Sequence, residues 1–129
     1  MNHPSYAKIN IGLRVLGKRP DGFHDILSIF LEVDLADELT IGSRTDGVIT
    51  VRCSHPDIPD GAENLAFRAA DALRKASSDS TLGCEIEIEK RIPSGGGLGG
   101  GSSNAALVIS RLNEIWKTRL QDVELHRIA

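Results

Sequence analysis

The stretch Ile92-Pro-Ser-Gly-Gly-Gly-Leu-Gly-Gly-Gly-Ser-Ser-Asn104 decides the organisation of this 129-residue chain, because it holds six of the 13 glycines. A run with strand-like alternation, 84–90, precedes it, and a run with helical periodicity begins near Ser103. A glycine-rich turn between a strand and a helix brings backbone N–H groups close to a phosphate. We therefore predict a phosphate-binding loop at residues 92–104.

Length and composition are those of one globular domain. The net charge of -3 provides no basic field, so we expect no nucleic-acid partner. No apolar run approaches the roughly 20 residues that span a bilayer, and no apolar signal segment opens the sequence, so we expect a cytoplasmic protein without a membrane partner. Cys53 and Cys84 have no Cys-x-x-Cys pair near them, so we expect buried thiols and no metal site.

The first half of the chain is predicted to consist of strands. Between Ala7 and Leu16 apolar and polar residues alternate, so one face of this strand is expected to be buried, and the other places Lys8 and Asn10 side by side. A Pro-Asp-Gly turn follows at 20–22. The expected strands are 7–16, 23–34, 38–43 and 48–54, and we predict a meander of antiparallel neighbours.

A helix and a further strand are predicted before the glycine-rich stretch. Apolar residues at helical spacing predict a helix that opens at Glu63 or Asn64 and stops near Ala76. In the strand at 84–90, apolar residues alternate with glutamates. This pattern is typical of a sheet that is covered on one side only.

Two helices are predicted after the glycines. Ser102 or Ser103 is expected to cap the first one, because serine is a favoured N-cap residue. This helix is strongly apolar and runs to Trp116. A second helix is expected to start near Gln121.

Several kinds of phosphate-binding loop compete for the glycine-rich stretch. A Walker-type loop requires a lysine that meets the phosphates, and Ser102 stands at that position. Gly95, Gly97 and Gly100 match the dinucleotide fingerprint Gly-x-Gly-x-x-Gly. However, the strand before a dinucleotide-binding loop is apolar on both faces, whereas the strand here carries three glutamates. Neither pattern fits the chain well.

A third kind of loop fits better. Residues 93–103 follow the pattern Pro-x-Gly-x-Gly-Leu-Gly-x-x-Ser-Ser, which resembles the phosphate loop of the GHMP kinases, the superfamily of galactokinase, homoserine, mevalonate and phosphomevalonate kinases. Its glycines allow positive φ and a close approach of the backbone. The amides exposed at a helix N-terminus form a concavity that favours an anion.

Further motifs resemble one branch of this superfamily, whose kinases phosphorylate a hydroxyl of a cytidine-diphosphate conjugate of a polyol in non-mevalonate isoprenoid (terpenoid) biosynthesis. The motifs occur in the order of that branch and cover the chain nearly from end to end. They are Ala-Lys-Ile-Asn at 7–10 with Gly-Leu at 12–13, Arg-Pro-Asp-Gly-Phe-His at 19–24, Glu-Asn-Leu at 63–65, and Gly-Gly-Gly-Ser-Ser-Asn-Ala-Ala at 99–106.

The resemblance implies the fold of the GHMP-kinase N-terminal domain: α+β, with a mostly antiparallel sheet, helices on one side and a left-handed β-α-β crossover at the glycine loop. It also implies a second α+β domain, with ATP and substrate in the cleft between the two. The sequence stops at Ala129, before the Gly-Ala-Asp motif that holds the general base of these kinases. We therefore expect residues 1–129 to be the ATP-binding domain alone, with little turnover by itself.

The resemblance also assigns roles to residues. Lys8 is the implied catalytic residue near the substrate hydroxyl and the γ-phosphate, and Asn10 is implied to bind the substrate. Phe23 is implied to stack on the cytosine, and His24 to read its edge. ATP with Mg²⁺ is the implied cofactor. The implied ATP-binding residues are Asn64, Leu65, Lys90, Pro93, Gly95, Gly96, Gly97, Leu98, Gly99, Gly100, Gly101, Ser102, Ser103 and Asn104.

Two alternatives stay open. The first is a kinase for another alcohol, such as homoserine or mevalonate, which has no need of a cytosine reader at 20–24. The second is a non-catalytic nucleotide-binding module, which the lack of the aspartate motif favours. Without a second domain, we also expect an uncovered apolar face along the helix at 105–116, and self-association through it.

Overall fold

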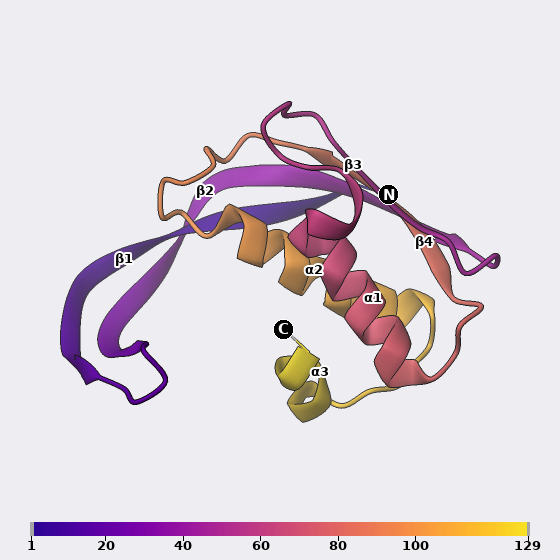
Figure 1. Ribbon diagram of the computed structural model, residues 1–129. Coiled ribbons are helices and arrows are strands. Elements are labelled where there is room, and N and C mark those ends of the chain that lie inside the picture. The colour runs from indigo at the N-terminus through magenta and orange to yellow at the C-terminus, as the bar shows by residue number, and fades with distance from the viewer. Residues whose placement is uncertain (1, 129) are drawn as a thin grey trace.

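The protein folds as a four-stranded sheet with helices on one of its faces. The computed structural model describes residues 2–128. Figure 1 shows the sheet arching over helices α1 and α2, with α3 below them, which agrees with the predicted α+β class. In chain order the elements are β1 (Asn2–Lys18), β2 (His24–Arg44), β3 (Ile49–Cys53), the 3₁₀ turn η1 (Gly61–Glu63), α1 (Leu65–Ser77), β4 (Gly83–Glu89), α2 (Gly100–Ile115) and α3 (Asp122–Ile128).

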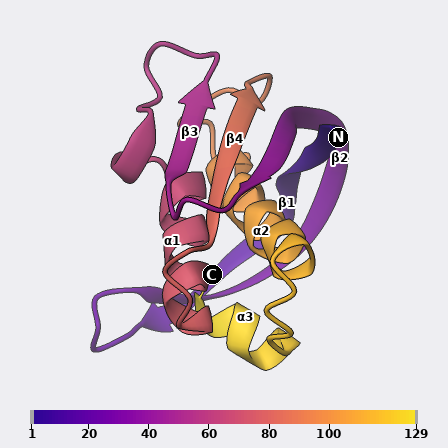
Figure 2. The same cartoon turned by 90° about the vertical axis from the view of Figure 1, so that its right-hand side faces the viewer.

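The strand order is β1-β2-β4-β3, so the predicted meander is wrong. β2 pairs antiparallel with β1 and with β4, whereas β3 lies beside β4 and runs parallel to it. Figure 2 shows the arrows of β3 and β4 pointing the same way. A β3–α1–β4 unit is thereby formed, and the glycine-rich stretch follows it. Alternation along a strand indicates which face is buried but does not indicate the neighbouring strand.

β2 is one strand of 21 residues, whereas the sequence predicts separate strands at 23–34 and 38–43. The prediction places a break where Asp34 and Asp37 interrupt the apolar pattern, because aspartate is depleted in strands. In the structure Asp37 is fully buried and accepts backbone hydrogen bonds, so the strand continues through it. A shift in the register of β1 against β2 lies close to this point.

The core lies between the inner half of the sheet and the two long helices. The glutamates of β4 point outwards and its apolar residues point inwards, as predicted. α1 begins after Asn64, whose side-chain oxygen accepts a hydrogen bond from Ala66 N at 2.9 Å, so the predicted start of this helix is confirmed. The larger core residues are Leu39, Ile41, Ile49, Val51, Leu73, Ile86, Ile88, Val108, Ile109, Leu112 and Trp116.

The outer halves of β1 and β2, residues 9–31, form a two-stranded arm that extends beyond the helices, curving away at the left of Figure 1. The sequence predicts half-buried faces for these strands. This prediction is wrong over the arm, because neither α1 nor α2 covers it. Its apolar side chains are exposed, with Phe23 72% exposed near the tip. The exposed apolar residues of the arm are Ile9, Ile11, Leu13, Val15, Leu16, Phe23, Ile26, Leu27, Ile29, Phe30 and Leu31.

The apolar face of α2 is covered, in contrast to the expectation from the sequence. Val108, Ile109 and Leu112 are buried in the core against the sheet and α1. The prediction of an uncovered apolar face along 105–116 is therefore wrong. The uncovered apolar surface lies on the arm instead. Self-association stays a prediction. No helix within residues 2–128 is both long enough and apolar enough to cross a membrane.

Candidate functional site

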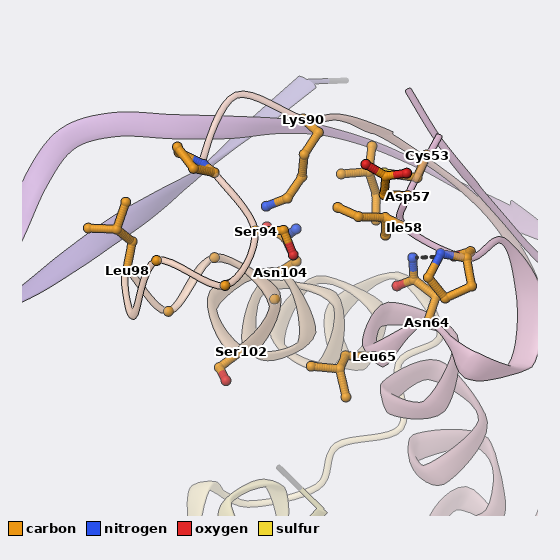
Figure 3. Close-up of a pocket in the computed structure, with 18 of the residues that line it drawn as sticks. Cys53, Asp57, Ile58, Asn64, Leu65, Lys90, Ser94, Leu98, Ser102 and Asn104 are labelled. Atoms are coloured by element: carbon orange, nitrogen blue, oxygen red, sulfur yellow. Dashed lines mark hydrogen bonds between the residues drawn. The ribbon is translucent and has the colours of Figure 1, made fainter. Parts of the chain in front are cut away.

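A pocket of about 350 Å³ lies beside the glycine-rich stretch. Residues 93–102 form one wall with their backbone, and Ile58, Pro59 and Leu65 contribute apolar surface to the other. In Figure 3, Lys90 descends from the sheet above the pocket, and Leu65 and Ser102 lie below it. A pocket with a glycine-rich wall and an apolar wall suits a ligand that joins an anionic part to a flat apolar part.

Glycines determine the conformation of the loop and the start of α2. Gly95, Gly97 and Gly99 have φ of 77°, 71° and 73°, in the left-handed region that glycine adopts without strain. The turn at Gly99 lets α2 begin at Gly100, so the predicted N-cap at Ser102 or Ser103 is wrong. No side chain caps this end of α2 within the part of the chain that is described. Its first N–H groups, which lack helical partners, are thus free to bind an anion.

Asp37 lies behind the loop and was not among the residues that the sequence singled out. Its side chain is fully buried. Oδ1 accepts hydrogen bonds from the backbone N–H groups of Arg91 and Ile92, both at 2.8 Å. Oδ2 accepts from Lys90 Nζ and, at 3.0 Å, from Asn104 Nδ2. These five residues, the Asp37 cluster, hold both ends of the glycine-rich stretch. The one sequence signal was an aspartate within an otherwise strand-like pattern.

Burial by itself would raise the pKa of Asp37, but the hydrogen bonds from Ile92, Lys90, Arg91 and Asn104 together hold it below its usual value of 3.8. A carboxyl group with a lowered pKa stabilises the folded state fully above the pKa of the unfolded chain. This contribution is lost as the pH falls through the lower, folded-state pKa.

We therefore expect the free energy of unfolding of Asp37→Asn to fall less steeply at acidic pH than that of the native protein. The free energy of unfolding of the native protein should exceed that of the variant by a constant amount above about pH 5, and this difference should shrink below about pH 4. Urea unfolding between pH 2.5 and 7 measures it. A difference that stays constant to the lowest pH would contradict the buried, ionised state of Asp37.

Lys8 reaches the glycine-rich stretch from β1. Its Nζ donates to the carbonyl oxygen of Gly97 at 2.8 Å and to Asn10 Oδ1 at 2.9 Å, and its backbone N–H donates to Leu98 O. The ammonium also lies 5.4 Å from the ring centre of Phe30. Lys8 and Asn10 thus lie side by side, as predicted, and the fold brings them to the loop at Gly97.

The predicted ATP-binding residues gather around the pocket, with one exception. All of them line it except Ser103, whose Oγ accepts a hydrogen bond from Ser5 of β1 at 2.8 Å. Asn64 caps α1 and also donates to Pro59 O at 3.0 Å, so its side chain holds the apolar wall in place. Asn104 is 4% exposed, and its Oδ1 has no hydrogen-bond partner among the described residues.

Phe23 and His24 are not brought to this pocket. Both lie at the tip of the arm, where their side chains are exposed. The turn before them is held by a hydrogen bond from Phe23 N to Asp21 Oδ1 and by Gly22, which has a φ of 89°. The structure therefore presents two groups of predicted residues, one at the loop and one on the arm.

Comparison with protein families and sequences gives one consistent result. The family model described as "GHMP kinases N terminal domain" matches residues 64–129. A 4-diphosphocytidyl-2-C-methyl-D-erythritol kinase of Citrifermentans bemidjiense is 50% identical over 123 residues, which are 95% of this chain and 44% of the relative. The kinase of the same name from Chlorobium phaeobacteroides is 46% identical over 125 residues, 97% of this chain and 42% of the relative. The chain thus spans less than half the length of these curated relatives.

Solved structures agree at the level of the fold. A crystal structure of 4-(cytidine 5'-diphospho)-2C-methyl-D-erythritol kinase superposes with a TM-score of 0.80 at 37% identity, covering 100% of this chain and 46% of the other. The mevalonate kinase of Methanococcus jannaschii superposes with a TM-score of 0.71 at 16% identity, covering 99% and 44%. At that identity the second likeness concerns the fold alone.

Proposed function

The chain belongs to the GHMP kinases, and from this premise we propose that it is the N-terminal, ATP-binding part of a 4-diphosphocytidyl-2-C-methyl-D-erythritol kinase. The proposed reaction transfers the γ-phosphate of ATP to the 2-hydroxyl of the cytidine-diphosphate conjugate, in cytoplasmic isoprenoid precursor biosynthesis. The observation that carries the ATP-binding role is the pocket, which combines uncapped first-turn amides of α2 with an apolar wall. The amides suit phosphates, and the apolar wall suits the adenine ring.

The residues around the pocket fit a magnesium nucleotide. Mg²⁺ in nucleotide sites is held mainly by phosphates and water, with one or two side-chain oxygens. The Ser102 hydroxyl is exposed in the first turn of α2, and the carboxylates of Asp57 and Glu63 line the same pocket. Within residues 2–128, no three His, Cys, Asp or Glu side chains form a metal site of their own. When bound, the ion neutralises part of the phosphate charge.

In this proposal the residues of the chain bind and orient the reacting groups. The amides at the start of α2 hold the phosphates, while Lys8, fixed by Gly97 O and Asn10, offsets the negative charge that grows on the transferred group. Asp37 is unsuited to be the general base, because its carboxylate is buried and already accepts four hydrogen bonds. We propose that the base lies outside residues 1–129, in a Gly-Ala-Asp motif of the complete protein.

The cytidine-diphosphate conjugate is proposed as the substrate because of the arm. Phe23 is largely exposed and His24 is next to it, so a base can stack on one and hydrogen-bond to the other. Stacking of a base on an aromatic ring contributes about 1–3 kcal/mol. A kinase for mevalonate or homoserine, and a non-catalytic nucleotide-binding module, are the alternatives that the experiment below separates.

The test is an assay of the intact protein with ATP and three acceptors: the cytidine-diphosphate conjugate, mevalonate and homoserine. We expect turnover with the first alone, and we expect Phe23→Leu to raise its KM about tenfold while the KM for ATP stays unchanged. Leu16→Ala, an exposed apolar position on the same arm, is the matched control and should change neither KM. Turnover with mevalonate or homoserine would favour the first alternative, and nucleotide binding without turnover would favour the second.

A further inference from the structure

The Asp37 cluster joins the two ends of the glycine-rich stretch through one carboxylate. Oδ1 binds the backbone at Arg91 and Ile92, directly before the loop, and Oδ2 binds Asn104 in the first turn of α2, directly after it. The cluster is shielded from solvent, because Asp37 is 0% exposed and the Lys90 side chain 6% exposed. No other carboxylate among the described residues makes contacts on both sides of the loop.

We propose that Asp37 is a positioning residue for nucleotide binding, which fixes the separation of the loop ends and the orientation of Asn104. This inference rests on the proposed ATP-binding role of the pocket. The loop between Pro93 and Gly99 contains glycines that cost much conformational entropy to order. A carboxylate that already holds both ends reduces the ordering that remains when phosphates bind.

The orientation of the Asn104 amide follows from its hydrogen bond with the carboxylate of Asp37. A carboxylate only accepts hydrogen bonds, so the amide of Asn104 must turn its Nδ2 towards Asp37. Its Oδ1 is consequently directed away from Asp37, and it is buried without a hydrogen-bond partner within residues 2–128. An unpaired buried acceptor is unfavourable, so a donor from the ligand or from the rearranged loop is expected to reach it when the site is filled.

Lys90 is the second group that Asp37 controls. Lys90 lines the pocket, but its ammonium is paired with Oδ2 of Asp37, so the carboxylate compensates its charge. A Cβ added at Gly100 would lie 2.8 Å from Nζ, so the first turn of α2 closes tightly over this pair. Asp37→Asn is nearly isosteric and keeps the acceptor for Arg91 and Ile92. It places an amide donor against two other donors, Lys90 and Asn104, and so breaks the α2 side of the cluster.

The test compares ATP affinity and the two KM values in the intact protein. We expect Asp37→Asn to weaken binding of a non-hydrolysable ATP analogue, measured by calorimetry, by about tenfold, the lower end of the loss seen when a group that orients a metal ligand is removed. The KM for ATP should rise in parallel, while the KM for the cytidine substrate stays unchanged. Val51→Ala, a core substitution away from the loop, serves as a control for lost stability and should change neither KM.

Two further variants keep the test decisive if Asp37→Asn folds poorly. Asn104→Leu removes one donor and leaves Asp37 three others, and it should also weaken nucleotide binding severalfold. The double variant Asp37→Asn/Asn104→Asp restores an amide–carboxylate pair with its polarity reversed, and it should recover affinity relative to Asp37→Asn.

Unchanged ATP affinity in both Asp37→Asn and Asn104→Leu would overturn the inference. Equal increases in both KM values in Asp37→Asn would also overturn it if Val51→Ala, at the same melting temperature, showed the same increases. A merely structural role of Asp37 predicts that result. A native protein that binds no nucleotide would overturn the proposed function itself. The two failures are therefore distinguishable.

Discussion

Replacing Lys8 with methionine is expected to lower kcat of the intact protein by about 10²–10³-fold, the usual cost of removing one group that stabilises transition-state charge. Lys8 Nζ is held by Gly97 O and Asn10 Oδ1, so its charge is fixed at the loop before the nucleotide arrives. Methionine keeps most of the aliphatic stem and removes only the ammonium. Single-turnover kinetics with saturating ATP measure the effect.

The affinity for ATP should change much less than kcat in this variant, because the amides of the loop and of α2 remain in place. Lys8→Arg is the matched control. It keeps the positive charge, but its planar guanidinium does not reproduce the geometry of the ammonium, so we expect partial activity. A kcat of Lys8→Met close to that of the native protein would show that Lys8 only supports the loop.

The second large effect is expected for Gly99→Val, which should lower kcat about 10²-fold and so approach the loss in Lys8→Met. Gly99 has a φ of 73°, and a Cβ there would lie 3.0 Å from Lys8 Cε and 3.2 Å from Lys8 Cγ. The lysine stem must yield by a few tenths of an ångström to the added Cβ, and further to the γ-methyl groups of valine, so we expect the bond from Nζ to Gly97 O to be weakened or lost. The backbone conformation itself costs roughly 1–2 kcal/mol for a residue with a side chain.

Gly97→Val provides the comparison for this prediction. Gly97 has a φ of 71°, but no atom of the described residues lies within 4 Å of a Cβ added there, so only the backbone strain is shared with Gly99→Val. The difference between the two variants therefore measures the displacement of Lys8. In a Lys8→Met background that difference should vanish, because residues acting through one contact are not additive. A difference of the same size in both backgrounds would contradict the proposed coupling.

Patterns along the amino-acid sequence are sufficient to predict several of the elements and the type of loop. Alternation and helical spacing predicted β4, α1 and the helix after the glycines, because these patterns depend on which side chains meet water. The spacing of glycines, leucine and serines in residues 93–103 indicated the type of phosphate loop. Short-range rules of this kind operate within one element or one turn, where the sequence holds the necessary information.

Packing between distant segments sets how these elements meet. It placed β3 beside β4 and left the arm uncovered, because strand partners and helix coverage depend on packing between distant segments. It moved the start of α2 to Gly100, since the left-handed turn at Gly99 opens the helix early. It also brought Asp37 under the loop, where donors from residues 90–92 and 104 stabilise a buried charge that the sequence presents only as an interruption of a strand.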